Sequence, residues 1–325
     1  MYEAAPAWEE FYRRLEAQAR SFISPSTGSV DERYVERVAC PVCGSEDYGL
    51  RAVKHGFSYA ECRVCEFVYL NPQLTQQALA GIYNDEDVRS FYFEELLLPY
   101  VERDQQKEFH GRARRLRAFV RKKDARLLDV GCAAGNFLGI ASRYGFRAEG
   151  LELNNRYVDY AQRHRGVTIQ NKPLEEMNYA EESFDAVTLW DVIEHLPQPL
   201  KTLKELSRIT AQGGVIGLTT INHACVNERI LRERWRYYAP PDHVCSFTPK
   251  IMRSMLERSG FAVLEIQHHY MFEVLALDRW FSRKSGSSIV ATAQKGMYVA
   301  ASALMGKLFS ILRSGDLITV YARKR

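Results

Sequence analysis

The sequence predicts an α/β domain with a doubly wound, mostly parallel sheet, preceded by a small cysteine-rich module and a helical linker. Short apolar strands alternate with amphipathic helices from Arg126 onward, and the first of these strands runs into a glycine-rich turn. Two C-x-x-C pairs lie upstream of that region. Alternation with short loops favours parallel pairing, because each helix returns the chain to the same edge of the sheet.

Seven segments have the length and apolar character of strands: 127–130, 147–151, 168–170, 184–190, 214–220, 262–267 and 317–322. Helical spacing of apolar residues separates several of them, at 137–144, 157–164 and 199–209. We therefore expect the α/β domain to occupy residues 126–325. The chain before it divides into a leading helix and linker at 1–38, the cysteine-rich module at 39–72 and a helical connector at 73–125.

The composition is typical of a globular protein in a reducing compartment. The formal net charge of +4 is too small to indicate a polyanion partner, and no uncharged apolar run reaches the roughly 20 residues that span a bilayer. The N-terminus lacks the basic start and apolar core of a secretion signal, and the seven cysteines do not form a disulfide framework. We therefore expect a cytoplasmic protein.

The apolar stretch 297–312 allows more than one interpretation. Lysines lie near its ends, so it could rest on a membrane surface or meet a partner. Packing in the core, or closure as a lid over a binding site, is the interpretation that we favour.

The glycine-rich turn after the first strand predicts a nucleoside-cofactor site. Gly131 and Gly135 lack a Cβ, which permits positive φ and a close approach of a ligand to the backbone. Glu152 ends the second strand, where a carboxylate can accept hydrogen bonds from both ribose hydroxyls. A structural turn beside an exposed acid is the weaker alternative. Nicotinamide enzymes use the same geometry, so a nicotinamide oxidoreductase remains open at this point.

Three segments carry a resemblance to a known family. They read L-L-D-V-G-C-A-A-G at 127–135, G-L-E-L-N at 150–154 and S-F-D-A-V-T-L-W-D-V-I-E-H-L at 183–196. As a set they resemble the class I S-adenosylmethionine-dependent methyltransferases, especially the bacterial branch with an F-D-x-V…E-H-L pattern. The later segments W-R-Y-Y-A-P-P-D-H-V-C-S-F-T and L-E-R-S-G-F also resemble that branch. The resemblance implies a seven-stranded sheet with an antiparallel final strand at 317–322.

The resemblance also implies S-adenosylmethionine as the methyl donor and places it at the carboxyl edge of the sheet. Glu152 would hold the ribose hydroxyls, and the end of the fourth strand would line the pocket beside the methionine part. The residues implied to bind the donor are Asp129, Gly131, Ala133, Gly135, Glu152, Leu174, Trp190 and Asp191.

Two positions depart from the family pattern. Ala133 stands where the middle glycine of G-x-G-x-G is usual, and it is small enough that we expect only a modest change. Pro173 stands where an acid often reads the adenine amino group. Adenine recognition would then fall to the backbone near Leu174.

Two histidines are candidates for the chemistry of methyl transfer. Displacement at a sulfonium depends mainly on aligning acceptor, methyl and sulfur, but an oxygen or carbon acceptor can also need a base. His195 follows the fourth strand, at the edge where doubly wound sheets bind ligands, and His243 lies in the loop P-P-D-H after the fifth strand. Each could instead order its own segment by hydrogen bonding.

The cysteine-rich module has the spacing of a zinc ribbon. Cys40 and Cys43 form one C-x-x-C pair, and Cys62 and Cys65 form the second after eighteen intervening residues. Four thiolates leave no open position on a tetrahedral zinc, so we expect a structural metal. Two disulfides or free thiols are the alternatives. A ribbon ahead of such a domain resembles a bacterial group that acts on sugars, often nucleotide-linked, in surface-polysaccharide or natural-product pathways.

We therefore expect methyl transfer to oxygen or carbon of a small acceptor, with a nucleotide-linked sugar as the candidate and residues 223–315 as the acceptor or lid region. The first rival is an RNA methyltransferase, favoured by the ribbon and by the basic helical run at 112–123. We interpret that run mainly as a solvated helix face, so a nucleic-acid partner is disfavoured. The second rival is a catalytically inactive module that only binds the cofactor.

Overall fold

The computed structural model describes residues 5–83, 85–99, 105–270 and 312–325. Its main element is a seven-stranded sheet in the order β12-β13-β10-β9-β6-β7-β8. The strands in chain order are β6 (Ala125–Val130), β7 (Phe146–Leu151), β8 (Thr168–Gln170), β9 (Phe184–Trp190), β10 (Thr210–Ile221), β12 (Phe261–His269) and β13 (Leu317–Lys324). The first five pair in parallel, and β13 lies antiparallel between β10 and β12. The expected class I methyltransferase fold is confirmed.

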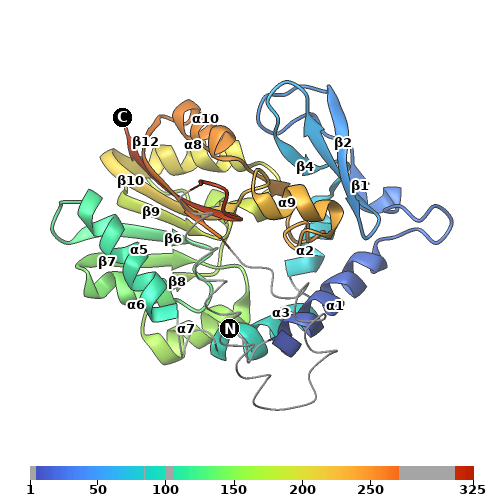
Figure 1. Ribbon diagram of the computed structural model, residues 1–325. Helices are drawn as coiled ribbons and strands as arrows, with labels where there is room; N and C mark the ends of the chain where they lie inside the picture. The colour runs from blue at the N-terminus through green and yellow to red at the C-terminus, as the bar shows by residue number, and fades with distance from the viewer. Residues whose placement is uncertain (1–4, 84, 100–104, 271–311) are drawn as a thin grey trace, which may run out of the picture.

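Helices cover both faces of this sheet (Figure 1). One face carries α8 (Pro199–Ile209) and α10 (Pro249–Arg258), and the other carries α5 (Gln105–Phe119), α6 (Asn136–Arg143) and α7 (Asn155–Arg165). All seven residues of β9 are buried, which explains why five of them are apolar and why the strand does not alternate between polar and apolar residues. Helix α10 begins at Pro249, and the Thr248 hydroxyl accepts a hydrogen bond from the Ile251 amide.

The cysteine-rich module forms a second, smaller sheet that the catalytic domain completes. Its own strands are β2 (Tyr48–Lys54), β3 (Phe57–Cys62) and β4 (Val68–Leu70). The fourth strand, β11 (Cys245–Ser246), comes from the region after the large sheet's fifth strand and pairs antiparallel with β4. The sheet order is β11-β4-β3-β2, so two segments far apart in the chain share one sheet (Figure 1).

Short helices connect the two sheets. Helix α1 (Ala5–Ser21) packs on α3 (Glu86–Phe91) and on the π-helical turn η3 (Tyr92–Leu97), while α2 (Gln76–Tyr83) follows the ribbon. A short pair, β1 (Val35–Glu36) with β5 (Gln73–Leu74), ties the first linker to the end of the ribbon. The remaining short helices are η2 (Glu32–Tyr34), η4 (Leu174–Glu176), η5 (Ile193–His195), α9 (Val226–Leu231) and η6 (Arg232–Arg234).

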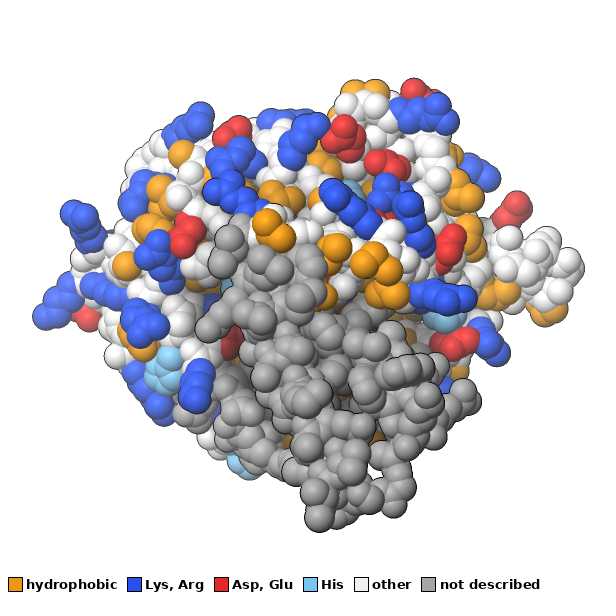
Figure 2. Space-filling model, in the orientation of Figure 1, with side chains coloured by type: hydrophobic (Ala, Val, Ile, Leu, Met, Phe, Trp, Pro, Cys, Tyr) orange, Lys and Arg blue, Asp and Glu red, His pale blue; other side chains and the backbone are white. Residues whose placement is uncertain are grey.

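The surface charge and the helix lengths relate to the expectations about nucleic-acid and membrane contact. Basic and acidic side chains are interspersed over the face shown in Figure 2. Within the described residues, none of the helices combines the length and apolar character needed to cross a bilayer. Most of the stretch 297–312, and with it the expected lid or membrane contact, lies outside the described residues.

Candidate active site

The glycine-rich turn joins β6 to α6 at the carboxyl edge of the sheet. Gly131 has φ of +70° and Gly135 has φ of +71°, conformations that glycine adopts without steric cost. A Cβ on Gly131 would lie 2.5 Å from Cγ2 of Val192, so its missing side chain also makes room for the segment after β9. The amides of Gly131 and Cys132 both donate to the Leu151 carbonyl, at 2.8 and 3.0 Å. These bonds hold the turn against the end of β7.

Glu152 points its carboxylate at this turn. One oxygen, Oε2, accepts from the Ala133 amide at 3.0 Å, and Oε1 accepts from the Asn154 amide at 2.8 Å. Burial raises the pKa of Glu152, while these two bonds lower it. A half-buried carboxylate beside a glycine turn has lone pairs left to receive ribose hydroxyls.

Asp129 lies on β6, two residues before Gly131, and is buried in the sheet. Its side chain is 2 % exposed, and its Oδ1 accepts from the Thr188 hydroxyl on β9 at 2.6 Å. Burial raises the pKa of Asp129 to about 7. This carboxyl joins β6 to β9 directly below the turn, so it supports the turn whatever further contact it makes.

Trp190 and Asp191 end β9 beside a buried arginine of α5. The Arg112 guanidinium lies 4.8 Å from the centre of the Trp190 ring and 3.4 Å from the Asp191 carboxylate. Asp191 has φ of +58°. The interpretation of the basic run as a solvated face holds for Arg114 and Arg115, which are exposed, but is wrong for Arg112, which is buried.

Two histidines from distant segments meet beyond the end of β9. The rings of His195 and His243 lie 4.9 Å apart in a T-shaped contact. Nδ1 of His195 donates to the Asp242 carbonyl at 2.8 Å, and Nδ1 of His243 donates to the Tyr237 carbonyl at 2.9 Å. Because a carbonyl can only accept, both Nδ1 atoms carry hydrogen, and in the neutral His243 ring Nε2 is the nitrogen that can accept a proton.

The two histidines have opposite pKa shifts. Burial, followed by the nearby charge of His195, lowers the pKa of His243 to about 4. Burial would also lower the pKa of His195, but the charges of Asp242 and Glu194 overcome it and raise the pKa to about 9. At neutral pH one ring is therefore neutral and the other is protonated.

Two buried acids support this pair. Glu194 is 2 % exposed, accepts from the Thr220 hydroxyl at 2.9 Å, and has a pKa raised to about 7, mainly by burial. Asp242 accepts from Arg89 at 2.5 Å, and the charge of Arg89 helps hold its pKa well below the usual range despite burial. Glu194 and the two histidines place one ligand atom each within 4.8 Å of one another, a spacing that could also hold a cation.

Arg89 connects the histidine pair to Glu152 beside the glycine turn. Besides bonding Asp242, its charge lowers the pKa of Glu152, and its carbonyl accepts from the Tyr157 hydroxyl at 3.3 Å. The charge of Asp191 in turn acts on the pKa of His243. Glycine turn, Glu152, the end of β9 and the histidine pair therefore form one site, with α3 beside them.

The four cysteines of the ribbon converge as the spacing predicts. The Sγ atoms of Cys40 and Cys65 lie 3.5 Å apart, as do those of Cys43 and Cys62. A tetrahedral zinc with Zn–S distances of about 2.3 Å needs sulfurs about 3.8 Å apart, so the four thiols fit it. In each knuckle the amide after the second cysteine, at Gly44 and Glu66, donates to the carbonyl of the first cysteine at 2.8 Å.

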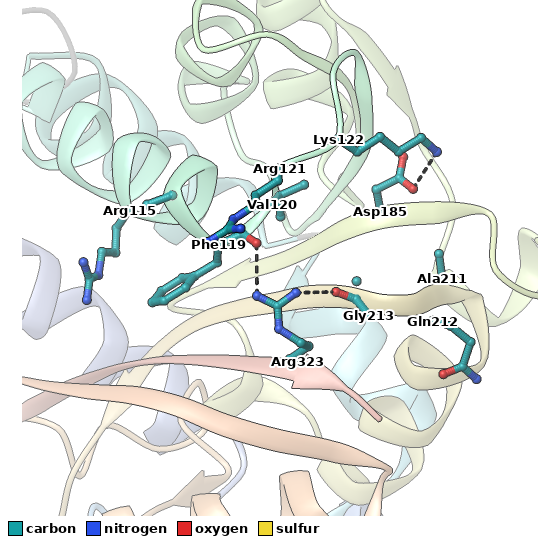
Figure 3. A pocket seen from close by; sticks show the side chains of 12 residues that line it. Arg115, Phe119, Val120, Arg121, Lys122, Asp185, Ala211, Gln212, Gly213 and Arg323 are labelled. Carbon is teal, nitrogen blue, oxygen red and sulfur yellow. Dashed lines mark hydrogen bonds and ion pairs between the residues drawn. The ribbon is translucent and has the colours of Figure 1, made fainter.

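A separate hollow of about 690 Å³ lies at the opposite edge of the large sheet (Figure 3). It is lined by the end of α5, the start of β9 and the 211–214 segment of β10. Two of its cations hold partners: Lys122 bonds Asp185 at 2.9 Å, and Arg323 donates to the carbonyls of Gly213 and Phe119. This hollow is remote from the glycine turn and we assign it no role.

Comparison with known proteins gives the class. A family model described as a methyltransferase domain matches residues 101–266, more than half of the 325-residue chain. The chain therefore belongs to the family of proteins that carry this methyltransferase domain. A solved S-adenosylmethionine-dependent methyltransferase from Archaeoglobus fulgidus shares the fold, with a TM-score of 0.50 and 18% identity over 71% of this chain and 100% of its own.

Curated relatives include ubiquinone biosynthesis O-methyltransferases. The protein from Aeromonas salmonicida is 27% identical over 158 residues, which are 45% of this chain and 66% of the relative. The one from Paracidovorax citrulli is 33% identical over 104 residues, 30% of this chain and 44% of the relative. The matches thus span about half of the length of these relatives.

The residues at the glycine turn fit the methyl donor. Glu152 faces the turn, and Nε1 of Trp190 is buried without an acceptor among the described residues, which a polar ligand at the end of β9 would supply. Leu174 begins the turn after β8 with its side chain in the core. Binding of the donor by the eight residues that the sequence singled out stays a prediction.

The sequence did not predict Arg89 as a site residue, nor the burial of Arg112. A signal for Arg112 exists, because it lies three residues after Phe109 and four before Leu116, on the apolar stripe of α5. No local signal marks Arg89, since its partners Asp242 and Glu152 belong to distant parts of the chain.

Proposed function

We propose that this methyltransferase methylates a hydroxyl oxygen of a small acceptor, with carbon as the alternative acceptor atom and a nucleotide-linked sugar as the candidate substrate. The observation that carries the proposal is the His195–His243 pair, which combines one neutral and one protonated ring at the carboxyl edge of the sheet. The names of the curated relatives, O-methyltransferases, support an oxygen acceptor.

Bound S-adenosylmethionine supplies an activated methyl group on a sulfonium, which is a good leaving group. Glu152 orients the donor through its ribose, and the turn at Gly131 and Gly135 fixes the backbone against it. Nε2 of His243, which is unprotonated, accepts the proton of the acceptor hydroxyl. Protonated His195 donates a hydrogen bond to a polar group of the acceptor and is held in place by Asp242.

The low pKa of His243 favours oxygen over carbon. A hydroxyl proton becomes strongly acidic as the new oxygen–methyl bond forms, so a weak base suffices to take it late in the reaction. A carbon acceptor must lose its proton before it attacks, which needs a stronger base than an imidazole with a pKa of about 4.

An RNA acceptor has less support from the same residues. Of the basic run, Arg112 is buried, Arg115 pairs with Glu265 at 2.5 Å and Lys122 pairs with Asp185. Basic and acidic side chains are interspersed over the face in Figure 2. A phosphate-binding surface needs cations that are clustered and available.

Labelled methyl transfer into an extract tests the proposal. The protein and S-adenosylmethionine carrying a labelled methyl group are incubated with a bacterial extract that has been separated into small molecules, RNA and protein. We expect label in the small-molecule fraction, as an acid-stable methyl ether identified by mass spectrometry. His243→Ala should reduce this labelling at least about tenfold with unchanged affinity for S-adenosylhomocysteine.

The location of the label decides between the candidates. Label in RNA, or a new carbon–methyl bond in the product, would contradict the assignment of a hydroxyl acceptor. Full labelling by His243→Ala would remove His243 from the chemistry. Binding of S-adenosylhomocysteine without labelling of any fraction would support an inactive module.

A further inference from the structure

The zinc ribbon holds the loop that carries His243. Strand β4 pairs with β11 in the register Tyr69 with Cys245 and Val68 with Ser246, directly after His243. The Leu70 amide extends this pairing by donating to the Val244 carbonyl at 2.8 Å. The backbone of the loop is therefore a strand of the ribbon's own sheet.

Tyr59 of β3 makes the one side-chain bond from the ribbon to His243 that the described residues show. Its hydroxyl donates to the His243 carbonyl at 2.8 Å, and its ring lies 4.7 Å from that of Tyr238. The side chain is 1 % exposed, and burial raises the pKa of Tyr59 so that it stays a donor. Loss of this buried hydroxyl would remove the bond to the His243 carbonyl.

The same contact reaches His195. The Val244 amide donates to the Glu194 carbonyl at 2.9 Å, and Sγ of Cys245 donates to the Leu196 carbonyl at 3.3 Å. The segments that carry the two histidines are thus bonded to each other through the loop that β4 holds. In the described part of the chain, no hydrogen bond joins the ribbon to Gly131 or Glu152 on the donor side.

The zinc ligands lie close to these contacts along the chain. Cys62 is the last residue of β3, three positions after Tyr59. Cys65 lies three positions before Val68, the first residue of β4. The Cys62 amide also donates to the Phe67 carbonyl, directly before β4, so movement of this knuckle would move the end of β3 and the start of β4.

We propose that the zinc ribbon positions the acceptor side of the active site, and that Tyr59 is the positioning residue through which the ribbon fixes His243. The ribbon then sets the distance between His243 and His195 while the donor site assembles independently of it. The proposal rests on the role of His243 in the proposed function, but its mechanical part concerns the position of the ring and can be measured without an acceptor.

A matched pair of variants tests it. Tyr59→Phe removes the hydroxyl that bonds the His243 carbonyl, and Tyr69→Phe removes a buried hydroxyl that has no partner among the described residues. Both tyrosines are fully buried on neighbouring strands of the ribbon, so the loss of packing is the same. The readouts are the imidazole NMR signals of His243, assigned with His243→Ala, the affinity for S-adenosylhomocysteine and labelled methyl transfer into the small-molecule fraction.

We expect Tyr59→Phe to shift or broaden the His243 signals and to lower methyl transfer about tenfold. Its affinity for S-adenosylhomocysteine should stay within about twofold of the parent, because the donor side does not contact Tyr59. Tyr69→Phe should leave all three readouts unchanged. Unchanged His243 signals in Tyr59→Phe, or equal effects of the two variants, would overturn the proposal.

A second measurement covers the case in which Tyr59→Phe does not fold. The parent protein is compared before and after a chelator withdraws the ribbon's zinc, with metal content measured. If the His243 signals change while S-adenosylhomocysteine still binds, the proposal is supported. If the His243 signals change and S-adenosylhomocysteine no longer binds, the ribbon affects the donor side as well, and the proposal that it acts on the acceptor side alone is overturned. If His243→Ala keeps its activity while Tyr59→Phe still moves the ring, the proposed function fails and the coupling stands.

Discussion

His195 and His243 show how one site keeps a donor and an acceptor of protons side by side. Both rings are held by Nδ1–H bonds to backbone carbonyls, so their orientation is fixed by the chain. The negative charge of Asp242 then separates their pKa values, and Arg89 keeps that acid ionised. The pair therefore depends on four side chains from three separate segments.

The proposed roles predict the pH dependence of methyl transfer. Activity should fall as the pH rises through about 9, where His195 loses its proton, and as it falls through about 4, where His243 gains one. Asp242→Asn removes the charge that raises the pKa of His195, so the alkaline limb should move to lower pH while the acid limb stays below neutrality. Initial rates of labelled methyl transfer across this range measure both limbs. An alkaline limb that is the same in Asp242→Asn would exclude His195 as its source.

Glu152 makes a second prediction at the residue scale. Glu152→Gln removes the charge that would accept the ribose hydroxyls, and we expect the affinity for S-adenosylhomocysteine to fall about 10- to 100-fold. Glu149→Gln is the control, because Glu149 lies on β7, which ends one residue before Glu152, but its carboxylate accepts from the Tyr179 hydroxyl at 2.7 Å. Isothermal titration calorimetry compares the two variants. Equal affinities would mean that Glu152 does not hold the donor.

At the scale of elements, the close packing of α6 on β7 fixes the glycine turn. A Cβ on Gly150 would lie 2.5 Å from Sγ of Cys132 and 2.8 Å from Cδ1 of Leu138. Both of these atoms are buried, so neither side chain can swing aside. Gly150 therefore lets the turn and the first residues of α6 lie directly on the strand.

Two alanine substitutions separate this packing from helix propensity. Gly150→Ala should destabilise the protein by about 1–3 kcal/mol through overpacking and weaken S-adenosylhomocysteine binding by displacing the turn. Gly139→Ala, in α6, meets no atom within 4 Å and should stabilise by about 0.5–1 kcal/mol through higher helix propensity. Chemical denaturation gives both values. A harmless Gly150→Ala would show that the turn has room to move.

At the scale of the molecule, the ribbon and the catalytic domain share a buried interface. Arg51 of β2 bonds Glu228 of α9 at 2.8 Å, and Glu228 is 2 % exposed. The Lys54 ammonium donates to the Trp235 carbonyl at 3.0 Å. With the pairing of β4 and β11, these contacts make the ribbon part of the same folded unit as the methyltransferase domain.

Loss of Arg51 should therefore cost global stability. Arg51→Ala leaves the buried Glu228 carboxylate without its cation, and we expect a loss of about 2–4 kcal/mol. Arg63→Ala is the control, because Arg63 is 67 % exposed and its pair with Asp47 lies at the surface. We expect the ribbon and the catalytic domain to unfold in one shared transition. Arg51→Ala should move this transition to lower denaturant concentration, and Arg63→Ala should leave it unchanged. Separate transitions for ribbon and catalytic domain would contradict the single unit.

Local patterns predicted the elements well because the patterns are caused by short-range burial. Strand 184–190 and helix 199–209 begin and end at the predicted residues, since continuous burial and helical periodicity are both visible in the sequence. Strand β10 is longer than predicted and begins at Thr210 instead of Gly214. Its register with β9 shifts between Thr210 and Val215, across Gly213 and Gly214.

The sequence alone determined the class of fold, the glycine turn with its acid Glu152 and the four thiols of the ribbon. Each of these is encoded by residues close together in the chain, whose spacing directly reflects a strand end, a positive φ or a metal knuckle. Only the tertiary structure decided that β11 completes the ribbon's sheet, that Arg89 reaches Asp242 and that the two histidines face each other. These contacts join segments up to about 180 residues apart, and their pKa shifts arise from burial and neighbouring charges that exist only once the chain has folded.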